Sequence, residues 1–122
     1  MSKRILVVDD AAFARLQLKM VFEQNGAVVV GEAANGKECL MQYDILKPDL
    51  VTMDITMPDM DGITALKLLK EKHPEAKVVM CSAISQPDKF IQCIEAGASD
   101  FIVKPYKSEK IISILQALDK NK

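Results

Sequence analysis

Leu50-Val51-Thr52-Met53-Asp54 is a short apolar run that ends in a carboxylate, and it leads directly into Ile55-Thr56-Met57-Pro58-Asp59-Met60-Asp61-Gly62. Pro48-Asp49 before the run and the Pro/Asp/Gly cluster after it predict a buried β-strand that ends near Asp54. In an open α/β sheet, the carboxyl-terminal edge of the strands is where ligands bind. Taken alone, Asp54 is equally consistent with an ordinary strand-end or turn aspartate, so the rest of the chain must decide.

The chain is short and nearly neutral. Its 122 residues predict one domain over 1–122, and its formal net charge of -1 gives no basic surface for nucleic acid or for a membrane. The apolar run after Met1-Ser2-Lys3-Arg4 covers only Ile5 to Val8, which is too short for a signal peptide or a membrane span. We therefore expect a cytoplasmic protein that binds neither nucleic acid nor membranes.

The cysteine and histidine residues form no recognisable metal or disulfide pattern. Cys39, Cys81 and Cys93 are an odd number without a CxxC pair, and each lies in an apolar context that favours a buried, reduced thiol. The single histidine, His73, precedes Pro74 in a charged stretch. We expect it to be a solvated loop residue.

Strand and helix patterns alternate five times along the chain. Short apolar runs predict strands over 4–8, 28–30, 50–53, 77–81 and 101–103. The helices predicted after these runs carry apolar residues at helical spacing, namely Phe13, Leu16, Met20 and Val21; Leu40, Met41, Ile45 and Leu46; Ile63, Leu66 and Leu69; Phe90, Ile91 and Ile94; and Ile111, Ile114, Leu115 and Leu118. Apolar strands separated by helices predict a doubly wound, five-stranded parallel α/β sheet. The flavodoxin-like order 2-1-3-4-5 is the best-known arrangement at this size, although periodicity leaves the order of the strands open.

Polar residues follow four of the predicted strands at the edge where ligands bind. Asp9-Asp10, Asp54, Ser82 and Lys104-Pro105 come at the ends of the first, third, fourth and fifth strands. Carboxylates about 5 Å apart repel by roughly 3 kcal/mol at an effective dielectric near 20, so such a cluster needs a proton or a cation. An oxygen-only site suits Mg2+, and metal-assisted phosphoryl transfer is the chemistry that this set would serve.

Each of these residues also has an ordinary structural explanation. Asp9 and Asp10 could cap a helix that begins near Ala11, Ser82 could be a turn residue, and Lys104 could simply be solvated. Their joint occurrence at one predicted edge favours a functional site.

Four motifs resemble the receiver domain of bacterial two-component response regulators. They are Val7-Val8-Asp9-Asp10, Met53-Asp54-Ile55-Thr56-Met57-Pro58-Asp59-Met60-Asp61-Gly62, Ser82-Ala83 and Lys104-Pro105, in family order and spacing over the whole chain. Since no output domain follows, the chain is most similar to the single-domain chemotaxis (CheY-like) receivers. The residues around Asp54 and Met80-Cys81-Ser82-Ala83 are similar to the form that acts on flagellar motors in Gram-positive-type systems.

The resemblance implies a role for each residue of the site. Asp54 would accept a phosphoryl group from a histidine of a sensor kinase. Asp10 would bind Mg2+ directly, Asp9 directly or through a water, and the Thr56 carbonyl would complete the protein ligands together with Asp54. Lys104 would pair with one phosphoryl oxygen and Ser82 would donate a hydrogen bond to another.

The resemblance also implies a switch and an output surface. Phe101 would be the aromatic residue that moves inward when Ser82 turns to the phosphate, and because it has no hydroxyl it would act through packing. The Lys104-Pro105 bond is expected to be cis, and Thr56 and Ile84 occupy positions that control access of the hydrolytic water. The residues expected to contact an output partner are Lys89, Phe90, Tyr106, Lys107 and Lys110.

The expected function is therefore phosphorylation-dependent signalling by a monomer. Its partners would be a chemotaxis-type sensor histidine kinase, a flagellar motor switch protein and a phosphatase, and it would catalyse only its own phosphorylation and dephosphorylation. A single-domain phosphorelay intermediate is the main alternative. A small Mg2+-dependent phosphatase or phosphotransferase with an aspartyl nucleophile would need a capping insertion, and none is visible. A flavin or nucleotide binder would need a glycine-rich phosphate loop after the first strand, which the sequence lacks.

Overall fold

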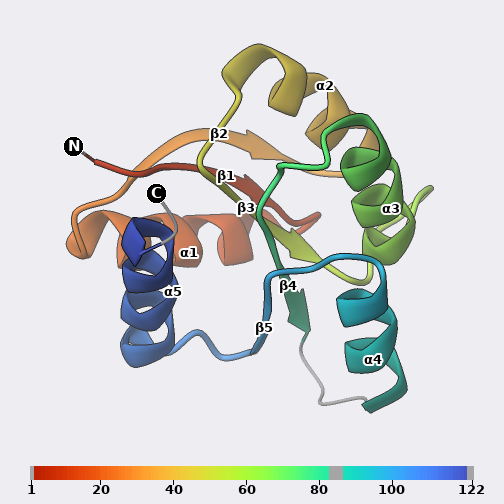
Figure 1. Ribbon diagram of the computed structural model, residues 1–122. Helices are drawn as coiled ribbons and strands as arrows, with labels where there is room; N and C mark the ends of the chain where they lie inside the picture. The colour runs from red at the N-terminus through yellow and green to blue at the C-terminus, as the bar shows by residue number, and fades with distance from the viewer. Residues whose placement is uncertain (1, 83–86, 121–122) are drawn as a thin grey trace.

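The structure is a computed structural model that describes residues 2–82 and 87–120, and strands and helices alternate along it (Figure 1). The elements are β1 (Arg4–Val8), α1 (Ala12–Gln24), β2 (Val28–Ala33), α2 (Gly36–Leu46), β3 (Leu50–Asp54), α3 (Gly62–Lys72), β4 (Val78–Ser82), α4 (Pro87–Glu95), β5 (Asp100–Val103) and α5 (Ser108–Lys120). The strands form one parallel sheet in the order β2-β1-β3-β4-β5, which confirms the flavodoxin-like prediction.

Helices cover both faces of the sheet (Figure 1). On one face, Leu6 and Val8 of β1 pack in a core with residues of α2, α3 and α4. On the other face, Ile5 and Val7 of the same strand pack with residues of α1 and α5. Successive side chains of β1 thus enter opposite cores, which is why the strands of a doubly covered sheet are continuously apolar.

The strand register brings the carboxyl ends together. Val8 of β1 pairs with Met53 of β3, and Asp54 pairs with Cys81 of β4. Strand β2 extends to Ala33, beyond the predicted end at residue 30. Gly31 lies within this extension, and a Cβ there would lie 2.5 Å from the Gln42 side chain and 2.6 Å from the Leu46 side chain, so a larger residue would require these side chains to move.

The apolar spacing of α3 and α5 identifies their buried faces, whereas that of α1, α2 and α4 does not. Ile63, Leu66 and Leu69 of α3 are buried, as are Ile111, Ile114 and Leu118 of α5. In α1, however, Phe13, Leu16 and Met20 are 64%, 53% and 51% exposed, while Leu18 and Phe22 fill the core. In α2 the buried residues are Cys39 and Tyr43 rather than Met41 and Ile45, and in α4 Cys93 is buried while Phe90, Ile91 and Ile94 are exposed. These helices carry apolar residues on more than one face, and the position of the sheet selects the buried one.

The three cysteines are free and buried, as predicted. Burial raises the pKa of Cys39 and of Cys81 to about 12, so neither thiol is a ready nucleophile. None of the helices in the described ranges is long and apolar enough to cross a bilayer.

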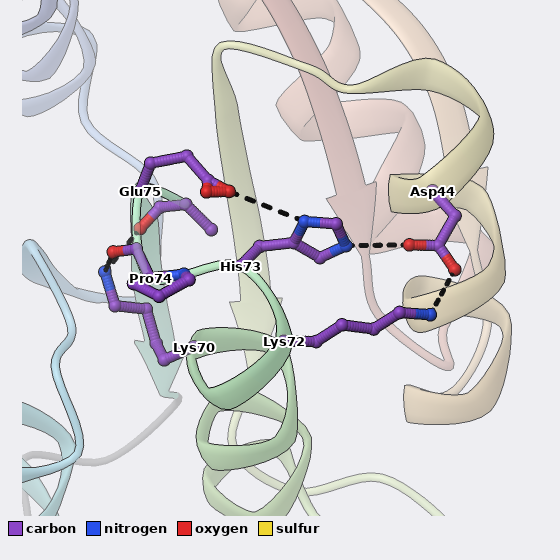
Figure 2. Close-up of polar contacts among 7 residues, drawn as sticks. Asp44, Lys70, Lys72, His73, Pro74 and Glu75 are labelled. Carbon is purple, nitrogen blue, oxygen red and sulfur yellow. Dashed lines mark hydrogen bonds and ion pairs between the residues drawn. The ribbon is translucent and has the colours of Figure 1, made fainter.

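The loop position predicted for His73 is confirmed, but the prediction that its side chain is solvated was wrong. His73 follows the last turn of α3, its side chain is only 19% exposed, and its Nε2 lies 2.7 Å from Asp44 Oδ1 of α2 (Figure 2). Lys72 Nζ contacts the other Asp44 oxygen at 2.6 Å, and Glu75 lies 3.5 Å from His73 Nδ1. The ring also packs against Tyr43, with centroids 4.7 Å apart. His73 therefore joins the ends of two neighbouring helices, a contact that its local sequence does not show.

Candidate functional site

Three aspartates meet at the carboxyl-terminal edge of the sheet. Asp9 and Asp10 follow β1, and Asp54 ends β3. One carboxylate oxygen from each of them lies within 4.8 Å of the other two. Asp9 and Asp54 are buried and Asp10 is exposed, so the cluster has one side open to solvent.

Asp9 is held by its backbone and by its side chain. Its Oδ1 accepts a hydrogen bond from the Ala11 N–H at 2.9 Å, and its Oδ2 lies 3.0 Å from Lys104 Nζ. Its N–H donates to the Ala33 carbonyl at 3.0 Å, and its carbonyl accepts from Arg15 Nη1 at 2.6 Å. The N-cap of α1 is Ala11, without a side-chain hydrogen bond, so neither aspartate is the helix cap that the sequence also allowed.

Asp54 lies in a desolvated and negatively charged environment. Burial, and after it the charge of Asp9, raises the pKa of Asp54, although Lys104 partly opposes this shift. Lys104 Nζ is 3.5 Å from Asp54 Oδ2, and the Thr56 N–H is 3.4 Å from Asp54 Oδ1. Burial alone would lower the pKa of Lys104, but its hydrogen bond to Asp9 and the charge of Asp54 outweigh burial and raise it. Lys104 is thus a charged ammonium shared between two carboxylates.

The donor chemistry of this cluster fits a hard divalent cation. It offers carboxylate oxygens and no sulfur or imidazole, and Lys104 compensates only part of its negative charge. Mg2+ binds such oxygen sites through one or two carboxylates and keeps several waters, which the open side at Asp10 allows. Thr56 lies beside the cluster on the loop after β3, with its N–H toward Asp54.

The loop from β3 to α3 holds Asp54 through close backbone packing. The Gly62 N–H donates to the Ile55 carbonyl at 2.7 Å, and a Cβ on Gly62 would lie 2.0 Å from the Asp54 carbonyl oxygen. Asp61 caps α3 by accepting from the Thr64 N–H at 2.8 Å. The first turn of α3 therefore packs directly on the backbone of Asp54, which is possible because residue 62 has no side chain.

Ser82 and Lys104 are joined through their backbones. The Lys104 N–H donates to the Ser82 carbonyl at 2.7 Å, and the Lys104-Pro105 peptide bond is cis. This contact places the half-buried Ser82 at the same edge as the aspartates. Ala83 and Ile84, which belong to the predicted motif and to the predicted control of water access, lie outside the described residues.

Phe101 and the predicted output residues lie around β5. Phe101 is buried, and its ring meets Phe90 of α4 edge-on, with centroids 5.4 Å apart. Lys89, Phe90 and Lys107 are exposed, and Lys110 pairs with Asp100 at 3.0 Å. Tyr106 packs partly against the core beneath α1 and α5, with Lys104 Nζ 5.9 Å from the centre of its ring. Tyr106 therefore lies beside Lys104, a residue of the acidic site.

Sequence reasoning missed Arg15. Its guanidinium contacts the Asp9 carbonyl and Glu32 of β2, although its own helix shows no motif. An arginine five residues after an aspartate pair is the only signal that the sequence offers, and it is too common to be specific.

Comparison with known proteins identifies relatives along nearly the whole chain. The model of the response regulator receiver domain matches residues 5–116. The chain is 49% identical over 120 residues to the chemotaxis protein CheY of Thermotoga maritima, covering 98% of this chain and 100% of that protein. It is 51% identical over 115 residues to the chemotaxis protein CheY of Bacillus subtilis, covering 94% and 96%.

Solved structures give the same result. A chain of the CheX-CheY-BeF3-Mg+2 complex from Borrelia burgdorferi is 36% identical, with a TM-score of 0.90 over 96% of this chain and 89% of that chain. The response regulator domain of Thermotoga maritima CheB is 37% identical, with a TM-score of 0.84 over 98% and 96%. With its fold and its acidic edge, the chain belongs to the response regulator receiver domain family.

Proposed function

We propose that this protein is a chemotaxis response regulator that is switched by phosphorylation of Asp54. The observation that carries the proposal is the position of Asp54, whose carboxylate lies at the sheet edge between two further aspartates and Lys104. The high identity to chemotaxis proteins named CheY supports the same function. The donor would be a phosphohistidine of a chemotaxis-type sensor kinase.

The reaction transfers a phosphoryl group from nitrogen to oxygen. An Asp54 oxygen forms a bond to phosphorus while the N–P bond of the phosphohistidine breaks, and the electron pair of that bond returns to the imidazole. Asp9, Asp10, Asp54 and the Thr56 carbonyl would hold Mg2+, which when bound offsets the negative charge of the phosphoryl oxygens. Burial of Asp54 keeps its carboxylate poorly solvated and therefore reactive.

Lys104 and Ser82 would respond to the new charge. In the structure Lys104 Nζ already lies between Asp9 and Asp54, so a short movement would bring it to a phosphoryl oxygen. The Ser82 hydroxyl would donate to a second oxygen. Because the Lys104 N–H donates a hydrogen bond to the Ser82 carbonyl, movement at either residue would displace the end of β5.

The signal would reach the surface through Phe101. Its edge-on contact with Phe90 links the core of the sheet to the exposed side of α4, so a shift of one ring would move the other. The affected surface would carry Lys89, Lys107 and Lys110 and would bind a flagellar motor switch protein.

The proposal also includes a phosphatase partner, control of water access, and a monomeric state. A phosphatase is expected as a further partner, and one solved relative is a complex that contains CheX, CheY, BeF3 and Mg2+. Thr56 and Ile84 would set the access of water to the phosphoryl group. The protein would act as a monomer in the cytoplasm and catalyse only its own phosphorylation and dephosphorylation.

The proposal is tested by intact mass after incubation with acetyl phosphate, with Mg2+ or with EDTA. Wild type should gain one phosphoryl group only with Mg2+, and Asp54→Asn should gain none. Asp59→Asn is the matched control, because Asp59 is an exposed aspartate on the same loop, and it should behave as wild type. An adduct on Asp54→Asn, or none on wild type, would contradict the proposal.

Binding to motor switch protein that increases with beryllofluoride and Mg2+ would support the chemotaxis role, whereas transfer to a histidine-containing domain without such binding would indicate a phosphorelay intermediate.

A further inference from the structure

Arg15 links the acidic turn to the edge strand of the sheet. From α1, its Nη1 donates to the Asp9 carbonyl at 2.6 Å, and its Nε donates to Glu32 Oε1 at 3.0 Å. The Arg15 side chain is 18% exposed and that of Glu32 is 42% exposed. Glu32 is fixed in turn, because its strand pairs with β1 and its carbonyl accepts from Gln42 Nε2 at 2.6 Å. One guanidinium thus joins the end of β1 to the end of β2.

Not all the contacts of Asp9 can persist during the proposed reaction. Among the described residues, Asp9 is held by Ala11, Ala33, Arg15 and Lys104. If Lys104 turns to a phosphoryl oxygen, its contact with the Asp9 carboxylate weakens or is lost. The contacts that remain are the hydrogen bond to the Ala33 carbonyl, the one from the Ala11 N–H to the Asp9 carboxylate and the one from Arg15 to the Asp9 carbonyl. Of these three, only the last is made by the side chain of another residue.

We propose that Arg15, held by Glu32, is a positioning residue for the divalent-cation site. It keeps the Asp9-Asp10 turn in the geometry that binds the metal, whether or not Lys104 contacts Asp9. This inference rests on the proposed function, since it needs a metal bound by Asp9 and Asp10. The contact of Arg15 with the turn is to the Asp9 carbonyl, so it acts on the metal ligands through the backbone.

The guanidinium group suits this position because it carries several donors in a fixed plane. Nη1 and Nε reach two acceptors on different strands, whereas a lysine has one nitrogen on a flexible stem. Replacing Glu32 by glutamine keeps an oxygen that can accept from Arg15 Nε but removes the negative charge. This variant therefore tests the hydrogen bond separately from the charge.

Arg4 provides a matched control at the opposite edge of the sheet. Its Nη1 donates to the Leu46 carbonyl at 2.8 Å and to the Lys47 carbonyl at 3.2 Å. Like Arg15, it donates from Nη1 to a backbone carbonyl of another segment of the chain. Arg4→Gln should therefore lower stability by a similar mechanism and leave the acidic cluster unchanged.

The test is calorimetric titration with Mg2+ alone, together with the Tm of each variant in EDTA. Arg15→Gln and Arg15→Lys should weaken Mg2+ binding about tenfold, the lower end of the range for residues that orient metal ligands. The Mg2+ affinity of Glu32→Gln should stay within about twofold of that of wild type. The Mg2+ affinity of Arg4→Gln should also stay within about twofold, even where the Tm of this variant falls. Glu32→Ala leaves Arg15 in place but unsupported, and it should weaken binding about threefold, which keeps the test available if Arg15→Gln does not fold.

Two results would overturn the inference, and they are distinguishable from failure of the proposed function. If Arg15→Gln binds Mg2+ within about twofold of wild type, or if Arg4→Gln loses as much affinity, Arg15 does not position the site. If wild type itself does not bind Mg2+, the proposed metal site fails, and the positioning role fails with it.

Discussion

Replacing Gly62 by alanine tests whether the first turn of α3 must pack on the backbone of Asp54. A Cβ at residue 62 would lie 2.0 Å from the Asp54 carbonyl oxygen and 2.9 Å from the Ile55 Cα. These are backbone atoms that cannot rotate away, so the helix and the strand end must separate by about 1 Å to reach the shortest ordinary contact. The same separation would stretch the hydrogen bond from the Gly62 N–H to the Ile55 carbonyl, now 2.7 Å long.

The cost follows from these two changes. Overpacking of this kind costs about 1–3 kcal/mol, and a weakened hydrogen bond costs about 0.5–1.5 kcal/mol. Alanine restores up to about 1 kcal/mol through its better helix propensity and its smaller unfolded-state entropy. We expect Gly62→Ala to lower the free energy of unfolding by about 2–3 kcal/mol and to slow phosphorylation by acetyl phosphate, because Asp54 is displaced.

Gly26→Ala is the control for this experiment. Gly26 has a φ of +87°, and a Cβ added there would meet no atom within 4 Å, so alanine is strained only in its backbone, by about 1 kcal/mol. Urea unfolding at equilibrium measures both variants, and equal m-values would validate the comparison. If Gly62→Ala lost no more stability than Gly26→Ala, the close packing on Asp54 would not be what makes glycine necessary at residue 62.

Three further predictions concern buried and paired polar groups. Thr52→Val should raise the free energy of unfolding by about 1–2 kcal/mol in urea, since the buried Thr52 Oγ1 has no hydrogen-bond partner among the described residues; destabilisation would contradict this. Asp54→Asn should stabilise the metal-free protein near neutral pH, because burial and the charge of Asp9 raise the pKa of Asp54 above its unfolded value. That gain should disappear as the pH falls below the unfolded pKa, where Asp54 is protonated in both states, and urea titrations at both pH values measure it. Asp44→Asn should destabilise the protein near neutral pH, because the hydrogen bond from Lys72 is the main cause that lowers the pKa of Asp44. This contribution is present above the unfolded pKa and is lost as the pH falls through the folded pKa, so an undiminished difference in acid would refute it.

The sheet and the position of its acidic edge could be predicted from the sequence. Asp9, Asp54 and Lys104 come at the ends of apolar runs, and parallel strands bring such ends to one edge. The order of the strands could not be obtained from periodicity, because any right-handed winding buries the same runs. The order was expected because it is the best-known arrangement for a sheet of this size, and the structure confirms it.

The buried faces of three helices and the packing of His73 needed the tertiary structure. In α1, Leu16 and Leu18 are equally apolar, yet Leu16 is exposed and Leu18 is buried, because the choice depends on where the sheet lies. His73 contacts Asp44, which lies 29 positions earlier in the chain, and no local sequence pattern predicts a contact between residues so far apart. Arg15 escaped notice for the same reason, since its partner Glu32 lies on another element.

The most direct test of the central claim is to locate the phosphoryl group. Protein treated with acetyl phosphate and Mg2+ would be reduced with borohydride, which converts an aspartyl phosphate to homoserine, and then digested and sequenced by mass spectrometry. We expect homoserine at position 54 in wild type and unmodified aspartate at positions 9, 10 and 59. Homoserine at any of those other positions, or none at position 54 despite bound Mg2+, would contradict the assignment of Asp54 as the phosphoacceptor.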